Sequence, residues 1–175
     1  MLLTNHQSHL DPVLMGIACQ RRMNYLARKT LFDVPVLGWI IRSVGGISID
    51  RDGPGLAGIK ETLWRLRRRE MVLMFPEGRR TDNGEVGPLK PGFCALARRG
   101  NVTLLPVGID GAYDVWPRTH RLPRWGRINV WIGQPIGSEE VGQLSDEQLV
   151  DLVSRRMKAC QMAARGKRAA GRRSR

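Results

Sequence analysis

A run of five apolar residues at positions 71–75 constrains the fold of this 175-residue chain more than any other feature. A strand without polar alternation is buried on both faces, which is typical of a parallel sheet covered by helices. The preceding segment, 56–66, places leucine and isoleucine at helical spacing, with most of its basic residues off that stripe. A short helical segment, 93–99, leads into a second buried strand over 102–109. This alternation predicts an α/β fold: a single domain with a mixed, largely parallel sheet flanked by helices.

Other segments extend the same pattern. Short strands are expected at 24–27, 47–50 and 127–132, from their apolar content and the turn residues around them. The first helix is expected to begin at Asp11, acting as its N-cap, with Pro12 at the first helical position.

The last helix and the tail behind it differ in composition. Ser145 and Gln148 form a capping-box pattern at the helix start, and an apolar stripe follows. Residues 165–175 then contain six basic residues and no acidic ones. This composition predicts a basic, disordered tail behind a domain over 1–164.

Charge limits the classes of partner, and cysteine content indicates the redox compartment. The net charge is +13, and the chain before the tail is basic as well. A basic surface favours nucleic acid, an anionic membrane surface or a phosphorylated substrate. No segment reaches the roughly 18 uninterrupted apolar residues of a membrane span, so membrane contact is expected to be peripheral. The three widely spaced cysteines match no disulfide or metal pattern and suit a reducing compartment.

The sequence NHQSHLDP places an imidazole, His6, and a carboxylate, Asp11, five positions apart near the start of the chain. A loop of this length can fold back so that the carboxylate meets one ring nitrogen. The other nitrogen is then left to take a proton from a substrate. In the alternative interpretation Asp11 only caps a helix and His6 only packs a turn, since caps are far commoner than catalytic dyads.

Two more polar clusters follow predicted strands, where α/β folds carry their sites. In GGISIDR, Arg51 emerges at a strand end, and in FPEGRRT, Glu77 and Gly78 leave a buried strand beside Arg80. Arginine suits a phosphate through its rigid fork of donors, and glycine lets the backbone approach it closely. Alternatively, Arg51 and Arg80 are solvated surface charges. Glu77 needs a partner after a buried strand, and the neighbouring arginines would supply one.

In content and order these clusters resemble the motif blocks of the glycerolipid acyltransferase family, which contains 1-acyl-glycerol-3-phosphate acyltransferase. NHQSHLD looks like the first block, NHxSxxD; GGISIDR like the second; FPEGRRT like the third, usually FPEGTRS; and LLPVGI like the proline-containing fourth. The stretch ARKTLFDVPVLGWIIRSVGG is similar to the family's AKxELFxxPxxGxxxxxxGG, with Arg28 for its usual lysine. Arg79 and Thr81 replace the family's usual threonine and serine. The resemblance covers roughly 3–137, and four ordered blocks are more specific than any one.

The resemblance implies transfer of an acyl group from a thioester, acyl-CoA or acyl-carrier protein, to the free hydroxyl of lysophosphatidate. His6 would be the general base, and Asp11 would hold its tautomer. Arg51 and Arg80, with Arg28, would bind the acceptor phosphate. Glu77 and Gly78 would shape that pocket, Glu77 by orienting an arginine. The resemblance implies no cofactor and no metal, and the sequence has no cluster with metal-ligand spacing.

Glycerol-3-phosphate or another lysophospholipid remains open as the acceptor. The product would be made on the cytoplasmic face of a membrane, to which the chain would bind peripherally. Apolar pieces within 31–41 are expected to form the acyl channel or simply core, and with the 165–175 tail they would dock the chain on anionic lipid. Trp116 and Trp125 suit the same surface. Family members normally carry an upstream segment, so the chain is expected to lack the family's N-terminal part.

Two other functions remain open from the sequence. A basic nucleic-acid-binding protein would explain the net charge, although aromatic residues make up only 6% of the chain and leave little for base stacking. A catalytically dead fragment that keeps the fold is the third possibility.

Overall fold

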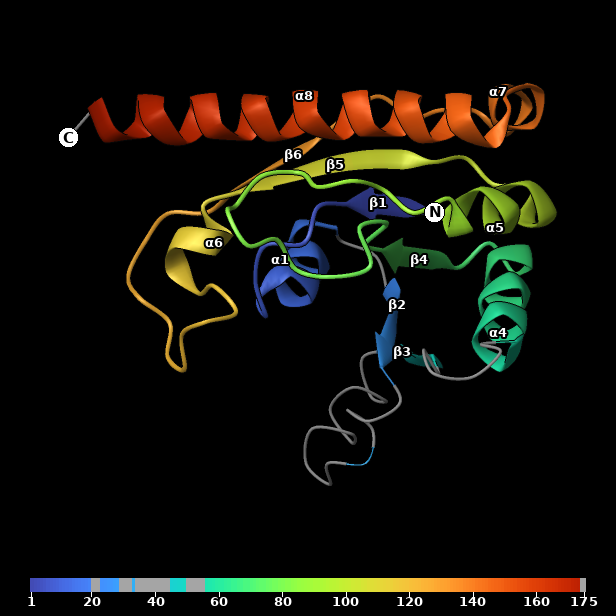
Figure 1. Cartoon of the computed structure of the whole chain (residues 1–175), viewed down its shortest axis with the longest axis horizontal. Helices are drawn as coiled ribbons and strands as arrows, with labels where there is room; N and C mark the ends of the chain where they lie inside the picture. Colours follow the sequence, from blue (N-terminus) through green and yellow to red (C-terminus); the bar gives the residue numbers. More distant parts are fainter. Residues whose placement is uncertain (20–22, 29–32, 34–44, 50–55, 174–175) are drawn as a thin grey trace.

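A computed structural model describes residues 1–19, 23–28, 33, 45–49 and 56–173. These residues form a six-stranded sheet in the order β3-β2-β4-β1-β5-β6 (Figure 1). The strands are β1 (Leu2–Thr4), β2 (Met23–Arg28), β3 (Gly46–Ile49), β4 (Met71–Met74), β5 (Leu105–Asp110) and β6 (Asn129–Ile132). The helices are α1 (Asp11–Ala18), α4 (Leu56–Arg67), α5 (Gly92–Gly100), α6 (Ala112–Val115), α7 (Ser138–Gln143) and α8 (Asp146–Arg173).

The sheet is mixed and largely parallel, as predicted. β1 pairs in parallel with β4 and β5, and β2 pairs in parallel with β3 and β4. Only β6, which pairs with β5, is antiparallel within this sheet. The carboxyl ends of the five parallel strands therefore meet at one edge, which is where α/β folds carry their ligands.

Helices cover both faces of the sheet. Because side chains alternate along a strand, Leu2 and Leu3 of β1 point to opposite faces. Leu3 belongs to a buried cluster with Phe93 of α5 and Met157 of α8. Leu2 belongs to another with Met15 of α1 and Ala112 of α6. The chain is thus a three-layer α/β/α domain, and Figure 1 shows the long α8 and the short α1 and α6 on different sides of β5.

The predicted elements are present, and three short ones were missed. β1 has three residues and α6 has four, so neither is long enough for a periodic pattern to emerge. α7 has six residues, of which only Val141 is buried, so its sequence shows no apolar stripe either. The capping box at the start of α8 is confirmed: Ser145 N donates to Gln148 Oε1 at 2.9 Å, and Gln148 N donates to Ser145 Oγ at 3.2 Å.

The prediction of a disordered tail from Arg165 is wrong for residues 165–173, because α8 continues to Arg173. Alanine, arginine and lysine are strong helix formers, so the tail composition also favours a helix. Its charges find partners on the domain. Arg165 and Arg168 pair with Asp110 at the end of β5, and Lys167 lies over the ring of Trp131.

Several predictions fall outside the described residues. Arg51 and the apolar pieces at 31–32, 36–37 and 39–41 are among them. In the described part of the chain, none of the helices has the length and apolar character needed to cross a bilayer.

Candidate active site

The turn between β1 and α1, residues 5–10, is held from several sides. Asn5 bonds the backbone of Ile109 in β5 twice, as donor to its carbonyl at 2.9 Å and as acceptor from its N–H at 2.7 Å. Gln7 donates to the Gly84 carbonyl at 2.6 Å and accepts from the Tyr113 N–H at 3.2 Å. The NHQ sequence thus ties the turn to β5, to the 81–91 loop and to α6.

Ser8 extends this support to the other side. Its hydroxyl donates to the Trp116 carbonyl at 2.7 Å and accepts from the Leu10 N–H at 3.2 Å. Ser8 is fully buried, so its side chain is not exposed to solvent. Its contacts make Ser8 a hydrogen-bonding support of the turn.

His6 and Asp11 come together in the turn. His6 Nδ1 lies 2.7 Å from Asp11 Oδ2, and the same oxygen accepts from the backbone N–H groups of Gln7 at 2.6 Å and Ser8 at 2.8 Å. Asp11 is therefore not the predicted N-cap: it is the first residue of α1, Leu10 takes the cap position, and the carboxylate turns back to the loop. Asp11 is fully buried, and its Oδ1 has no hydrogen-bond partner among the described residues.

The imidazole of His6 is fixed in orientation and still reachable. Its ring stacks on Phe75, with centroids 4.0 Å apart and planes 19° from parallel. Its side chain is 21% exposed. Within the described part of the chain nothing hydrogen-bonds Nε2, so that nitrogen is free to meet a substrate hydroxyl. With Nδ1–H donated to Asp11, Nε2 carries the lone pair that a general base needs.

Glu77 lies three residues after the end of β4, and its hydrogen-bond partners are not the predicted arginines. Its Oε1 accepts from the His6 N–H at 3.2 Å, and the Gly87 N–H also donates to the carboxylate. Burial raises the pKa of Glu77 to about 7, and these two backbone donors oppose the rise. Glu77 therefore holds the backbone of His6, whereas Arg79 pairs with Asp82 instead.

Gly78 shapes the turn after Glu77. Its φ is +72°, in the left-handed region that favours glycine, and its N–H donates to the Phe75 carbonyl at 3.0 Å. A Cβ at this position would also come within 3.1 Å of the Lys90 side chain. Glycine therefore lets the chain turn sharply beside His6 while Lys90 packs over it.

Arg80 lies beside a second imidazole, His9, with which its guanidinium is in contact. Burial, followed by the nearby positive charge of Arg118, lowers the pKa of Arg80. Burial, then Arg80, lowers the pKa of His9, whose ring also lies 5.3 Å from that of Trp116. The positive charge gathered around Arg80 favours an anion beside it.

A hollow of about 240 Å³ lies next to this cluster. Its lining combines carboxylate, guanidinium and glycine: Glu77, Arg79, Arg80, Thr81, Asp82, Asn83, Gly87 and Pro88. Of the predicted site residues, the structure thus brings His6, Asp11, Glu77, Gly78 and Arg80 to one place. Arg28 ends β2 at the same edge of the sheet, but its side chain, like Arg51, is outside what the structure describes.

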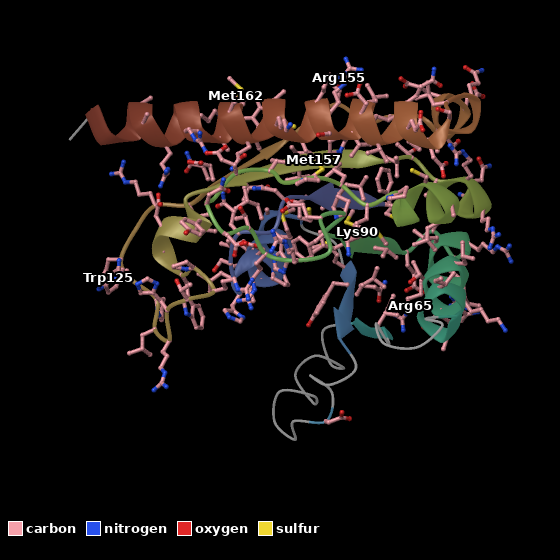
Figure 2. The ribbon with its side chains drawn as sticks, in the orientation of Figure 1. Arg65, Lys90, Trp125, Arg155, Met157 and Met162 are labelled. Atoms are coloured by element: carbon pink, nitrogen blue, oxygen red, sulfur yellow. The ribbon has the colours of Figure 1, made fainter. Side chains whose placement is uncertain are left out.

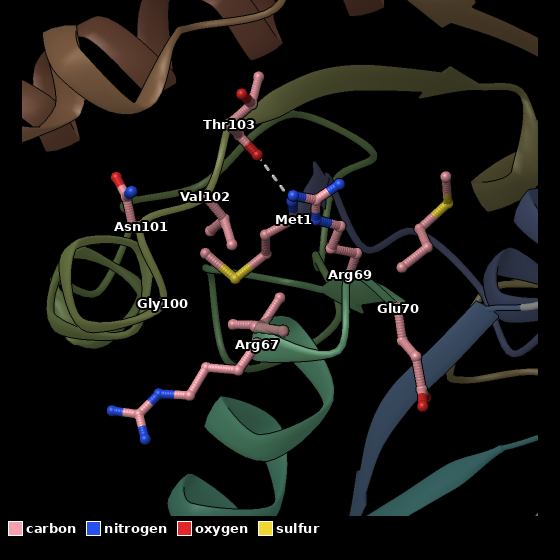
Figure 3. Close-up of a pocket in the computed structure, with 10 residues that line it drawn as sticks. Met1, Arg67, Arg69, Glu70, Gly100, Asn101, Val102 and Thr103 are labelled. Carbon is pink, nitrogen blue, oxygen red and sulfur yellow. Dashed lines mark hydrogen bonds between the residues drawn. The ribbon is translucent and has the colours of Figure 1, made fainter.

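A larger hollow, of about 580 Å³, lies at the other end of the strands (Figure 3). It is lined by residues at or just before the starts of β1, β4 and β5, among them Met1, Met71 and Thr103. Met1 N donates to the Thr103 carbonyl at 2.7 Å. None of the clustered polar residues described above reaches it. Size alone therefore does not locate the site in this fold.

Sequence reasoning missed the contribution of α8. Gln161 is buried, donates to the Gly84 carbonyl at 2.6 Å and accepts from the Val86 N–H at 3.3 Å. Gly84 is also the acceptor for Gln7, so α8 and the His6 turn hold the same loop. A signal was present: Gln161 continues the spacing of four that joins Val153 and Met157, so it is a polar residue on an apolar stripe.

No metal centre is formed by the described residues, among which no three His, Cys, Asp or Glu side chains cluster closely enough to hold an ion. The site combines a histidine base and its aspartate partner with an arginine-lined hollow.

Comparison with known proteins agrees with this chemistry. The chain is 28% identical over 157 residues to the 1-acyl-sn-glycerol-3-phosphate acyltransferase of Streptococcus pneumoniae, covering 89% of this chain and 56% of that protein. It is 31% identical over 146 residues to the Pseudomonas aeruginosa protein of the same name, covering 81% of this chain and 56% of that protein. The chain spans just over half the length of these two relatives.

A solved structure shares the fold. The crystal structure of the 1-acyl-sn-glycerophosphate (LPA) acyltransferase PlsC from Thermotoga maritima superimposes with a TM-score of 0.79 at 25% identity, covering 96% of this chain and 66% of that one. A model of the Acyltransferase family matches residues 1–110, a span that includes His6, Asp11, Glu77, Gly78 and Arg80. Since this match takes in well over half of the sequence, the chain belongs to the acyltransferase family.

Proposed function

We propose that this chain transfers an acyl group from a thioester to the free hydroxyl of lysophosphatidate, forming phosphatidate in phospholipid biosynthesis. The observation that carries the proposal is the 2.7 Å contact of His6 Nδ1 with Asp11, which leaves Nε2 free in a member of this family. The relatives' printed names point to the same acceptor.

Proton transfer starts at His6. Nε2 takes the proton of the acceptor hydroxyl as the oxygen attacks the thioester carbonyl. The resulting imidazolium is stabilised by Asp11, whose buried carboxylate is held by two backbone N–H groups. The tetrahedral intermediate then collapses, the C–S bond breaks, and the thiolate leaves with the proton from His6. Ser8 is committed to Trp116 and takes no covalent part.

The acceptor phosphate would lie against Arg80, assisted by Arg28 and Arg51. Arg80 is half-buried beside Arg118, and an anion would relieve the repulsion between them. Glu77 and Gly78 would set the shape of this end of the site, since Glu77 holds the His6 backbone and Gly78 makes the turn. Holding the phosphate fixes the distance from the hydroxyl to Nε2, which is the main benefit of positioning.

The donor would be acyl-CoA or acyl-carrier protein, and the chain would work as a peripheral protein on the cytoplasmic face of an anionic membrane. A cofactor has no part in this reaction scheme, because an alkoxide attacks a thioester without one.

The proposal is tested by incubating the purified chain with detergent-dispersed lysophosphatidate and oleoyl-CoA, following thiol release and identifying the lipid by mass spectrometry. Phosphatidate is the expected product, with little thiol release when the acceptor is omitted. Parallel reactions use glycerol-3-phosphate, lysophosphatidylcholine and acyl-carrier protein. Turnover of glycerol-3-phosphate alone would replace the proposed acceptor, and no turnover with any acceptor would contradict the proposed activity.

Arg80 provides the matched substrate test. Arg80→Ala should raise KM for lysophosphatidate at least tenfold while KM for the acyl donor changes little, whereas Arg155→Ala, an exposed arginine of α8 paired with Asp151, should change neither. Equal effects of Arg80→Ala on both substrates would show that Arg80 does not bind the acceptor phosphate.

A further inference from the structure

A cationic loop with an apolar tip leaves the domain after α6. Residues 117–127 include four arginines and no acidic residue. Trp125 is fully exposed, at 105% of its reference area, and Leu122 is 77% exposed. Figure 2 shows Trp125 projecting away from the body of the fold. Two large apolar side chains held in water among arginines are the pattern of a surface that meets an amphipathic partner.

The loop is folded rather than loose. The Trp116 indole N–H donates to the His120 carbonyl at 3.0 Å, and the His120 N–H donates to the Pro117 carbonyl at 3.1 Å. The Arg124 N–H returns to the Val115 carbonyl at 2.7 Å, which closes the loop at its base. These bonds hold Leu122 and Trp125 outward, so their exposure is a property of the fold.

The base of the loop adjoins the proposed active site. The Trp116 carbonyl accepts the hydroxyl of Ser8, two residues after His6, and the Trp116 ring lies against His9. Arg118 pairs with Asp82 of the loop that carries Arg80, at 3.4 Å. A partner bound by the loop would therefore lie on the side of the domain that carries the His6 turn.

Two arginines of the loop, Arg121 and Arg124, are available to a partner. Among the described residues neither Arg121 nor Arg124 has a carboxylate within ion-pair distance, and Arg124 contacts only the His120 ring at 2.7 Å. The basic end of α8, by contrast, is engaged by the domain through Arg165 and Arg168. Unpaired arginines around an apolar tip match an anionic lipid surface, with phosphates over the guanidiniums and the indole at headgroup depth.

We propose that residues 118–125 form a docking loop that inserts Leu122 and Trp125 into the interface of an anionic bilayer, with Arg121 and Arg124 on the lipid phosphates. Further apolar side chains are exposed on α1, which covers the same face of the sheet as α6: Val13 at 60% and Ile17 at 75%. This inference rests on the proposed function for its purpose, since docking would present His6 to a lipid acceptor, but its test needs no turnover.

Vesicle co-sedimentation measures the docking directly. The full chain, Leu122→Ser/Trp125→Ser and Arg121→Glu/Arg124→Glu are each mixed with phosphatidylglycerol vesicles and with phosphatidylcholine vesicles. Trp64→Ala is the matched control, because Trp64 is a half-exposed tryptophan of α4 with Arg68 over its ring. Figure 1 shows α4 on the opposite side of the view from α6 and the loop that follows it.

The full chain should prefer phosphatidylglycerol, and each double variant should lose at least tenfold in affinity while Trp64→Ala stays within twofold. Equal binding by the Leu122/Trp125 variant and the full chain, no vesicle binding by the full chain, or an equal loss in Trp64→Ala would each overturn the docking loop. Quenching of tryptophan emission by brominated phosphatidylglycerol, lost in Trp125→Phe, tests insertion without a variant that changes the surface strongly.

Turnover separates this inference from the proposed function. The Leu122/Trp125 variant should keep its rate on detergent-dispersed lysophosphatidate and lose rate on vesicle-borne lysophosphatidate. A full chain that binds vesicles but acylates neither form would contradict the proposed function and leave the docking loop standing.

Discussion

Asp11 and Asp110 are both buried aspartates near the carboxyl ends of parallel strands, and they have opposite kinds of partner. Asp11 binds His6, an imidazole that gains and loses a proton near neutral pH. Asp110 binds Arg165 Nε at 3.0 Å through Oδ1 and lies 2.7 Å from Arg168 Nε through Oδ2, close enough for an ion pair but not aligned as a hydrogen bond. Both guanidiniums stay charged throughout the working pH range.

This difference in partner separates a catalytic aspartate, Asp11, from a structural one, Asp110. Arg165 also bonds Glu85 at 2.7 Å, and its hydrogen bonds to Glu85 and Asp110 raise its pKa. Arg168 contacts Asp114 of α6. These pairs clamp α8 to β5, to α6 and to the loop that holds Gln7. Burial therefore does not identify the catalytic carboxylate, and the identity of its partner does.

The largest effect should follow from neutralising the first of the two aspartates. Asp11→Asn keeps an oxygen for the Gln7 and Ser8 N–H groups but no longer stabilises an imidazolium or fixes its tautomer. Acyl transfer should fall by roughly 10³–10⁴. Steady-state rates and a circular dichroism spectrum measure this. A folded Asp11→Asn enzyme with more than a tenth of the activity would make Asp11 a structural residue like Asp110.

Asp110→Asn should give the reverse outcome. Loss of the charge leaves Arg165 and Arg168 without their shared partner, and unfolding free energy should drop by about 2–3 kcal/mol, less than for a fully buried pair because Arg165 is 45% exposed. The folded enzyme should keep its kcat within severalfold. Urea titration measures the loss, with Asp151→Asn of an exposed pair on α8 as a control expected to change little. A stable Asp110→Asn protein with no activity would reverse the two roles.

Glu77 is a third buried carboxyl group, and its contribution to stability depends on pH. Its pKa is raised by burial from the ordinary 4.5 to about 7, so the folded state holds a proton that the unfolded state releases. Its contribution to stability is full below pH 4.5 and is lost as pH rises to 7. Glu77→Gln, which never ionises, should lose less stability than the wild type between pH 4.5 and pH 8, by on the order of 2 kcal/mol. Parallel stability curves for the two proteins at all pH values would mean that Glu77 titrates normally.

The smallest effect should come from the start of α8. Ser145→Ala removes the hydroxyl of the capping box and should cost about 1 kcal/mol of unfolding free energy. Activity at 25 °C should be unchanged, because the helix end at Arg165 and Arg168 still clamps the domain. The thermal midpoint measures the first and the acyl-transfer rate the second. A rate loss larger than twofold would show that the start of α8 affects the active site.

Local patterns predicted the layers of the fold and the His6–Asp11 contact, because both depend on residues close together in the sequence. The alternation of 56–66 with the run at 71–75 and the five-residue separation of the dyad are signals of this kind. The partners of Glu77 could not be predicted, since a backbone N–H such as that of His6 leaves no mark in the sequence. The pairing of Arg165 with Asp110 joins residues 55 positions apart. It therefore leaves no pattern within the tail itself.

The rate of His6→Ala measures the central claim most directly. The purified variant and the wild type are compared in thiol release from oleoyl-CoA with lysophosphatidate, at matched concentrations and with matching circular dichroism spectra. The account predicts a loss of roughly 10²–10⁴ in kcat, the contribution of a positioned general base, with no change in fold. A folded His6→Ala protein that retains wild-type turnover would contradict it.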